Sequence, residues 1–476
     1  MLNVYQILQQ SAESWPEHAA IIDEYGRLSF RQLYTDTEWL KQQLLASGLQ
    51  KGQGLGVMGR NSRAFVAAMF AGMGCGATVI PLSHQLKQAE LDSILTDTAL
   101  HAVIDDGSAS ASVPATASTL IFQHQPLNLR WTQANPMQPV VDSFEAAFIR
   151  YTSGTTGKSK GVVLSHHAVL ARIKAAQAAL QLSHDDIVLW VLPMAFHFLV
   201  TICLYLYRGV TFVITKDILA QTLIEDANIY QVTFLYAAPM HFRLLAADQS
   251  ATQLSSLRRA ISTSSAIPAH VAYAFNQRFG ISLIQAYGII EAGLPLLDHQ
   301  LKTAAPETVG YPAPEFEVSL LDQSFTTTKS GQTGQLAIRG PGLFDAYLKP
   351  WQNADNVMHD GWFLTGDLAQ QRADGKIIIC GREKAMINVA GNKAFPEEIE
   401  AALTHYPDIA DAYVYGQAHP LMGEVVCADI CLQSGKKLDV ESILHFCRQY
   451  LPTYKIPQKL FEVKEIARTH TDKIRR

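Results

Sequence analysis

Short apolar runs alternate with helical patterns from about residue 55 to residue 285, and this alternation constrains the fold more than any other feature. Runs that predict buried strands lie at residues 55–58, 77–81, 102–105, 187–192, 210–214, 232–236, 259–262 and 281–285. Helical periodicity occurs between them, for example at 63–73, 86–96 and 167–180. This order indicates an α/β fold with mostly parallel sheets that helices cover on both faces.

The pattern changes near residue 312. Strand-like runs at 316–321, 334–339 and 375–380 are separated by Gly, Asp and Asn turns, which predicts a β-rich subdomain over about 312–382. A small α+β unit follows, with helices predicted at 396–404 and 439–450. We therefore predict a large N-terminal domain at residues 1–382 and a small C-terminal domain at residues 383–476.

Composition excludes several classes of protein. Hydrophobic residues make up 48% of the 476 residues, which is too many for a disordered chain. A net charge of −5 argues against broad nucleic-acid binding. The start lacks the pattern of a signal peptide, and the apolar stretch 187–214 is interrupted by Pro193, His197 and Arg208, so we expect no membrane span. The six cysteines lack zinc-site spacing, which favours a cytoplasmic protein with reduced thiols. We expect residues 107–118 to form a solvent-exposed loop.

A glycine-rich segment, YTSGTTGKSKG at residues 151–161, is the strongest functional signal. Its glycines allow backbone N–H groups to face an anion, while hydroxyls and lysines add donors and positive charge. A P-loop would need glycine at Thr152, so that motif fails; a flexible surface loop is the plain alternative. The candidate phosphate-binding residues are Thr152, Ser153, Gly154, Thr155, Thr156, Gly157, Lys158 and Lys160.

This segment resembles the signature of the adenylate-forming superfamily, which includes acyl- and aryl-CoA synthetases, peptide-synthetase adenylation domains and luciferases. The resemblance covers nearly the whole chain in the family's order. Its further motifs are Asn61-Ser62, Gly76-Ala77 with Pro81, LPMAFH at 192–197, AYGIIE at 286–291, GWFLTGD at 361–367, GREK at 381–384 with Gly391, PEEIE at 396–400, and Lys473.

The resemblance implies attack of a carboxylate on the α-phosphorus of ATP to give acyl-AMP, and then transfer of the acyl group to a thiol. The cofactors implied are ATP and Mg²⁺, with CoA or a carrier-protein phosphopantetheine as acceptor. Tyr287 would lie against adenine, Asp367 and Arg382 would bind ribose, and Glu291 would ligate Mg²⁺. Lys473 would be the catalytic lysine of a mobile C-terminal domain that turns about Lys384 and presents a thioester-forming face around Gly391.

His197 is the most informative residue for the choice of acid. Amino-acid-activating relatives carry an aspartate near this point, whereas no acidic residue occurs in 196–210, so an α-ammonium substrate is disfavoured. His197 would contact the acid and take part in catalysis; its alternative is a core histidine. The predicted pocket, which suits a fatty or aromatic acid, is lined by His197, Phe198, Tyr236, Ser264, Ile289 and Leu294.

Two departures from the family pattern bear on the rate. Ile290 stands where a threonine hydroxyl is usual, and Asp472 precedes the catalytic lysine in place of glycine. Three functions therefore stay open: a ligase that makes acyl- or aryl-CoA, a ligase that loads an acyl carrier protein, and a nucleotide-binding pseudoenzyme. We expect no nucleic-acid partner, and the oligomeric state is open.

Overall fold

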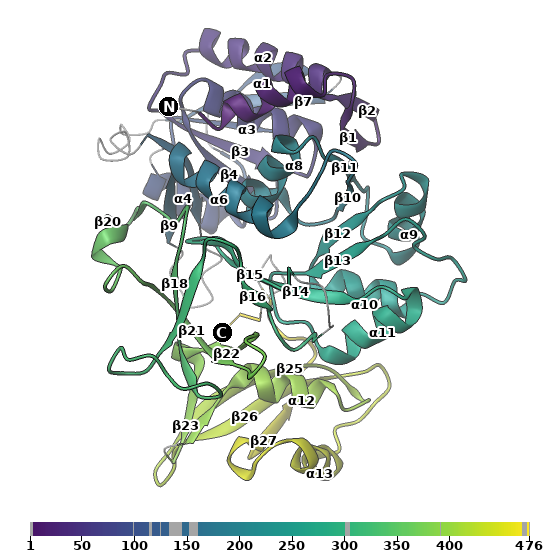
Figure 1. Ribbon diagram of the computed structural model, residues 1–476, viewed down its shortest axis with the longest axis vertical. Helices are drawn as coiled ribbons and strands as arrows, with labels where there is room; N and C mark the ends of the chain where they lie inside the picture. The colour runs from purple at the N-terminus through teal and green to yellow at the C-terminus, as the bar shows by residue number, and fades with distance from the viewer. Residues whose placement is uncertain are drawn as a thin grey trace.

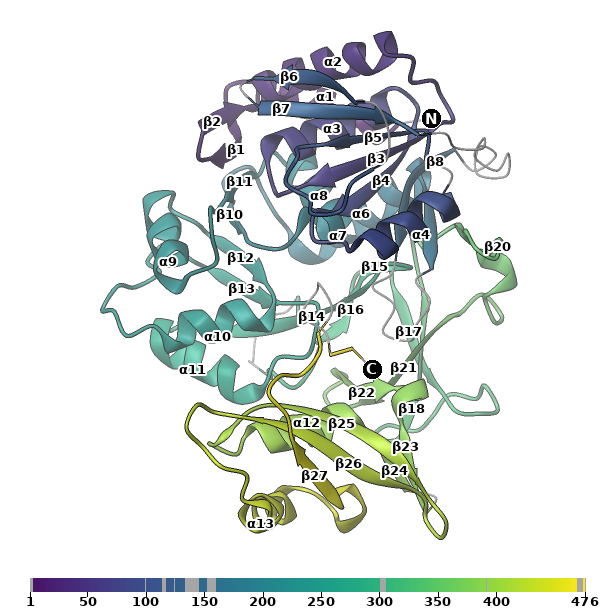
Figure 2. The same ribbon diagram turned by 180° about the vertical axis from the view of Figure 1, so that it is seen from behind.

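The protein is described by a computed structural model that covers residues 3–98, 100–113, 117–123, 125–132, 145–151, 160–299, 305–390, 392–468 and 474–475. Two sheets with their helices form one end of the molecule, a four-stranded antiparallel sheet lies beside them, and a small C-terminal unit forms the other end (Figures 1 and 2). The predicted α/β class is confirmed.

The first large sheet has a parallel centre and antiparallel edges. Each strand pairs parallel with the next along the series β14, β13, β12, β10, β11 and β1. Strands β15, β16 and β2 pair antiparallel at the two ends. In sheet order the strands are β16 (Tyr311–Pro312), β15 (Gly293–Leu297), β14 (Leu283–Ile289), β13 (Arg259–Ser262), β12 (Phe234–Ala237), β10 (Ile187–Trp190), β11 (Thr211–Ile214), β1 (Ala19–Asp23) and β2 (Gly26–Ser29).

The second large sheet is built the same way around parallel β8, β4, β3 and β5. Its order is β20 (Gln352–Asn353), β19 (Ala346–Tyr347), β9 (Gly161–Ser165), β8 (Ala146–Tyr151), β4 (Thr78–Ser83), β3 (Gly54–Gly59), β5 (Ala102–Asp105), β7 (Gln125–Trp131) and β6 (Ala117–Phe122). The antiparallel strands at both edges were not anticipated by periodicity, which reports burial and not strand direction.

Helices begin where serine or proline satisfies their first turn. Ser29 and Gln32 form a capping box for α2 (Phe30–Ala46), and Ser62 and Ser165 accept hydrogen bonds at the starts of α3 (Arg63–Gly74) and α6 (His166–Leu180). Pro239 opens α10 (Pro239–Ala247). The other helices of this part are α1 (Tyr5–Ser14), α4 (Gln88–Thr98), α9 (Ala220–Ile229) and α11 (Ala269–Phe279).

The interrupted apolar stretch 187–214 folds as strand, helix and strand, with the helical part between β10 and β11. This helical part folds as α7 (Met194–His197), a π-helical turn (Phe198–Ile202) and α8 (Cys203–Tyr207). Phe198 is buried and its ring lies 5.9 Å from Phe70 and 6.2 Å from Phe65, centroid to centroid. The helix therefore anchors His197 at the edge of the main core.

A third sheet, entirely antiparallel, carries two predicted site residues. Its order is β17 (Glu317–Leu321), β18 (Thr333–Arg339), β21 (Phe363–Gln371) and β22 (Ile377–Arg382). Asp367 on β21 lies directly opposite Arg382 on β22.

The C-terminal unit has its own core. The sheet order is β24 (Asn392–Ala394), β23 (Ile387–Val389), β26 (Gly423–Leu432) and β25 (Ile409–His419), and β27 (Lys459–Glu462) pairs with β26. Helices α12 (Pro396–Thr404) and α13 (Val440–Tyr450) contribute Ile399, Leu403 and Ile443 to a buried cluster with Val414 and Ile430. The boundary after residue 382 stays a prediction.

One expectation is wrong in part. Residues 107–118 do not form a simple solvent loop, because Ala111 and Val113 are buried in a cluster with Leu91, and β6 begins at Ala117. These two apolar residues at alternating positions pin the segment to the protein. Among the described helices, none combines the length and apolar character that crossing a membrane requires.

A partly buried histidine, His166, makes the stability of this fold depend on pH. The Val4 N–H donates to His166 Nδ1 at 3.2 Å, so the imidazole acts as a neutral acceptor. Burial lowers the pKa of His166 to about 4, although the charge of Glu145 opposes this shift. The unfolded chain, with a histidine pKa of about 6.5, therefore binds a proton that the folded chain excludes.

We expect the contribution of neutral His166 to be complete above pH 6.5 and to fall as the pH drops below that value. At pH 5 the loss is about 2 kcal/mol from this group. Urea unfolding midpoints measured from pH 8 to pH 5 should fall less steeply in His166→Gln than in the native chain. His167→Gln, at the exposed neighbouring position, is the matched control. Equal slopes in all three proteins would contradict the assignment.

Candidate active site

Tyr287, Asp367 and Arg382 come from three strands and meet at one carboxylate. The Tyr287 hydroxyl on β14 donates to Asp367 Oδ2 at 2.5 Å, and Arg382 Nε lies 2.6 Å from Asp367 Oδ1. Asp367 is buried, whereas the Arg382 side chain is 48% exposed. Burial raises the pKa of Tyr287, and the neighbouring Asp367 charge adds to this effect. The three residues that the sequence assigns to nucleoside binding thus lie in mutual contact.

Glu291 lies in the turn after β14, four residues beyond Tyr287. The Tyr347 hydroxyl donates to Glu291 Oε1 at 2.9 Å, and Lys160 Nζ lies 4.5 Å from the centroid of the Tyr347 ring. Burial raises the pKa of Tyr347, and the Glu291 charge reinforces this, so the tyrosine stays a donor. Lys160 and Glu291 are therefore brought to one place by a tyrosine that sequence reasoning missed.

Arg172 on α6 fixes the backbone of this turn. Its guanidinium donates to the carbonyls of Ile290 at 3.0 Å, Glu291 at 3.3 Å and Gly342 at 3.0 Å. Gly342 has φ +69°, and a Cβ there would lie 2.5 Å from Arg172 N, so the close approach needs glycine. Burial lowers the pKa of Arg172 to about 10, which leaves it charged at neutral pH. Sequence reasoning missed this residue as well.

The donor set fits magnesium held partly by a ligand. Within the described ranges, no group of three or more His, Cys, Asp or Glu side chains is arranged to hold a metal ion. Among the same residues, the Glu291 carboxylate is hydrogen-bonded only through Oε1. One carboxylate oxygen together with phosphate oxygens and water is a coordination that Mg²⁺ favours.

His197 and Ser264 meet at the other end of the site. Ser264 Oγ lies 3.4 Å from His197 Nε2, and Ser264 has φ +75°, a conformation that few residues other than glycine adopt. Asn61 holds the preceding loop, since its side chain donates to Leu192 O and accepts from Met194 N, both at 2.8 Å. Ser264 therefore contacts the His197 side chain, and Asn61 holds the loop that precedes this histidine.

The remaining predicted pocket residues are apolar or aromatic. Phe198, Tyr236 and Leu294 are buried, Ile289 is partly buried, and the Tyr236 hydroxyl donates to Thr263 Oγ1 at 3.0 Å. Burial raises the pKa of Tyr236 to about 12. These side chains are uncharged, and their role as the wall of an acid pocket stays a prediction.

The predicted hinge follows the Asp367–Arg382 pair directly. Lys384 is exposed in the short helical turn Glu383–Ala385, and Gln335 donates to Glu383 Oε2 at 2.9 Å. Gly391, Lys473 and the loop residues Thr152, Ser153, Gly154, Thr155, Thr156, Gly157 and Lys158 lie outside the described residues.

The C-terminal tail extends from the small unit to the large part of the protein. Arg468 pairs with Asp411 on β25 at 2.6 Å, whereas Arg475 Nη2 lies 3.8 Å from Glu90 Oε1 on α4. Figure 2 shows the chain passing from β27 to its C-terminal end near β14 and β22. Residues on both sides of Lys473 thus link the two parts.

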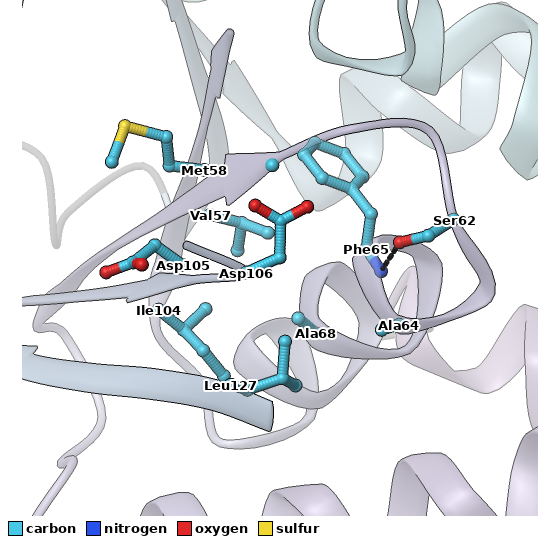
Figure 3. A pocket seen from close by; sticks show the side chains of 11 residues that line it. Val57, Met58, Ser62, Ala64, Phe65, Ala68, Ile104, Asp105, Asp106 and Leu127 are labelled. Atoms are coloured by element: carbon cyan, nitrogen blue, oxygen red, sulfur yellow. Dashed lines mark hydrogen bonds between the residues drawn. The ribbon is translucent and has the colours of Figure 1, made fainter. Parts of the chain in front are cut away.

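A pocket lies between β3, β5 and α3 (Figure 3). Its acidic side chains are already paired, because Asp105 accepts from Arg130 Nε at 2.6 Å and Asp106 accepts from Arg60 N at 2.9 Å. It lacks the predicted site residues, so we do not assign the reaction to it.

Comparison with known proteins identifies the family of this chain. Residues 8–348 match the profile of the AMP-binding enzyme family, and residues 398–473 match the AMP-binding enzyme C-terminal domain. An indoleacetate–CoA ligase of Aromatoleum aromaticum is 30% identical over 474 residues, which cover 94% of this chain and 92% of that protein. A feruloyl-CoA synthase of an Amycolatopsis species is 27% identical over 98% of this chain and 97% of its own length. The crystal structure of ATP-bound MatB from Rhodopseudomonas palustris has a TM-score of 0.85 at 21% identity, covering 100% of this chain and 97% of that one, and so shares the fold.

Proposed function

The chain belongs to the AMP-binding enzyme family and is an adenylate-forming ligase, and we propose that it joins an aromatic carboxylic acid to coenzyme A. The observation that carries the proposal is the uncharged acid site. His197 and Ser264 meet, the Tyr236 hydroxyl donates to Thr263 next to Ser264, and residues 196–210 contain no Asp or Glu. An α-ammonium group would be left without a counter-charge there. The named activities of the indoleacetate and feruloyl relatives support an aromatic substrate.

The reaction has two steps, adenylation of the acid and transfer of the acyl group to the thiol. A carboxylate oxygen attacks the α-phosphorus of ATP, a P–O bond forms, and the bond to the β-phosphate breaks to release pyrophosphate. The thiol sulfur then attacks the acyl carbonyl, the C–O bond to AMP breaks, and the thiol proton passes to solvent. Two anions meet in the first step, so the protein must supply positive charge and fixed donors.

The predicted site residues divide this work by position. Tyr287 and Asp367 hold the nucleoside, with Arg382 fixing the carboxylate. Lys160 and residues 152–158 bind the β- and γ-phosphates. Glu291, set by Tyr347 and by the Arg172 contact with its backbone, holds the magnesium ion. Magnesium, when bound, would offset the negative charge of the phosphates.

We expect pyrophosphate release to depend on ATP, Mg²⁺ and an aryl acid, with faster turnover when coenzyme A is added. The assay compares aryl, fatty and amino acids, each with and without coenzyme A. The rate of pyrophosphate release with aryl acids should exceed that with amino acids by at least about 10²-fold, because an unpaired ammonium is costly to bury. Turnover with a carrier-protein phosphopantetheine but not with coenzyme A would show that the carrier protein, and not coenzyme A, is the acceptor. The absence of release with every acid would overturn the proposal and favour a nucleotide-binding protein without this activity.

A further inference from the structure

Arg150 on β8 is partly buried, and its guanidinium has no hydrogen-bond or ion-pair partner among the described residues. Among the residues that the structure describes, it has no side-chain hydrogen bond and no ion pair, and its Nε is inaccessible to solvent. Its one recorded contact is with the Phe196 ring, 5.6 Å from the guanidinium carbon to the ring centroid. A guanidinium has five N–H donors, so an aromatic face satisfies little of its hydrogen-bonding capacity.

Such an arrangement is costly in a protein at rest. A buried N–H group without a hydrogen bond, such as Arg150 Nε, destabilises the fold, and proteins normally pair it. Arg172 donates its N–H groups to backbone carbonyls, whereas Arg150 Nε has no acceptor. The contrast between these two arginines indicates that Arg150 is kept for something other than the resting structure.

The surroundings of Arg150 favour a negatively charged ligand. Burial lowers the pKa of its guanidinium, the Glu291 carboxylate opposes that shift, and the positive charge of Arg172 adds to it. An arginine keeps its proton at neutral pH even so. Among the described residues, the charges of both Asp345 and Glu291 act on Arg172, whereas Glu291 is the carboxylate that acts on Arg150. An anion beside Arg150 would therefore add a favourable charge interaction.

The position of Arg150 lies between the two halves of the site. It is the residue before Tyr151, at the end of the strand that leads into the glycine-rich segment. Phe148, on the same face of β8, belongs to the main core, and Phe196 is the neighbour of His197. One arginine thus adjoins the acid-binding segment, the Glu291 turn and the start of the phosphate-binding segment.

We propose that Arg150 is a substrate-binding residue whose guanidinium donates hydrogen bonds to a phosphate oxygen of ATP. The inference rests on the proposed function for the identity of the ligand. A carboxylate oxygen of the acid offers the same chemistry, so the test must separate the two anions. Ile290 beside Glu291 is apolar and provides no competing side-chain donor at this turn.

The test compares Arg150→Gln and Arg150→Lys with the native chain by calorimetric titration of MgATP and of adenosine. Arg150→Gln should bind MgATP at least about tenfold more weakly, as expected for loss of a charge-assisted hydrogen bond. Adenosine affinity should change less than twofold, and Arg150→Lys should recover part of the MgATP affinity. Arg27→Gln, exposed on the distant strand β2, is the matched control.

Thermal unfolding separates this role from a structural one. Without nucleotide, Arg150→Gln should melt at or above the native temperature, because an unpaired charge has been removed; with MgATP, its upward shift should be smaller than the native shift. A clear fall in melting temperature without nucleotide, or unchanged MgATP affinity, would overturn the inference. If MgATP affinity is unchanged and the KM for the acid rises tenfold, the carboxylate is the ligand instead. If no acid supports turnover, the proposed function fails, while the MgATP titration still decides the role of Arg150.

Discussion

Lys473→Ala is expected to slow adenylation by at least about 10²–10³-fold while leaving thioester formation from supplied acyl-AMP within about twofold of the native rate. In adenylation, charge develops on the α-phosphate as the carboxylate attacks, and a lysine ammonium at that point offsets it. In thioester formation, the acyl-AMP already exists, so the same charge contributes little. Loss of the Lys473 ammonium should therefore impair adenylation and spare thioester formation.

The described neighbours of Lys473 make this asymmetry plausible in structural terms. Arg468 is tied to Asp411 in the small unit, and Arg475 reaches Glu90 on α4 of the large part. A tail that links the two parts in one arrangement can leave the site when the small unit turns.

The measurement uses two assays on the same protein preparations. Pyrophosphate release reports adenylation, and AMP release from supplied acyl-AMP with coenzyme A reports the second step. Lys464→Ala, an exposed lysine in the same C-terminal region, is the control and should match the native chain in both. Equal losses of both steps in Lys473→Ala would remove the assignment, since a general defect in folding or substrate binding would then explain the result.

The sequence identified the candidate nucleoside-binding residues, but it did not predict their contacts with one another. Tyr287, Asp367 and Arg382 stand in separate motifs, and the structure joins them through one carboxylate. The motifs are local patterns, so they can be found without knowing the fold. Their meeting depends on the pairing of β21 with β22 and on the packing of β14, which no local pattern encodes.

The residues that sequence reasoning missed act through tertiary contacts. Arg172 looks like one more charge in an alanine-rich helix, yet it holds the carbonyls of Ile290 and Glu291. Tyr347 lies in a two-residue strand far from Glu291 in the chain. Arg150 did leave a sequence signal, because a lone charge ends an otherwise apolar strand just before the glycine-rich segment.

Strand direction and loop anchoring were the other features that the sequence left undetermined. The antiparallel pairing of β7 with β5 puts a hairpin at the edge of a parallel sheet, although apolar runs look alike in both directions. Ala111 and Val113 are too small and too isolated to signal burial in a Ser- and Ala-rich segment.

Asp367→Asn is the second substitution for which we expect a large effect, and it should weaken ATP and adenosine to the same degree. In the structure, Asp367 Oδ2 accepts from Tyr287 and Oδ1 is paired with Arg382. A carboxylate has two acceptor oxygens, which suits the two hydroxyls of a ribose. An asparagine keeps one acceptor oxygen, replaces the other with a donor that opposes Arg382, and removes the charge.

Loss of one or two charge-assisted hydrogen bonds predicts an affinity decrease of about 10²-fold for both ligands. Calorimetric titration of adenosine and MgATP measures this directly, and the melting temperature without ligand shows whether the fold is retained. Asp374→Asn, an exposed acid in the turn between β21 and β22, should bind both ligands normally. The contrast with Arg150 is decisive: Asp367→Asn must affect adenosine, whereas Arg150→Gln must not. If Asp367→Asn weakened only MgATP, its carboxylate would act on the phosphates or the metal, and the nucleoside end of the site would have to be placed elsewhere.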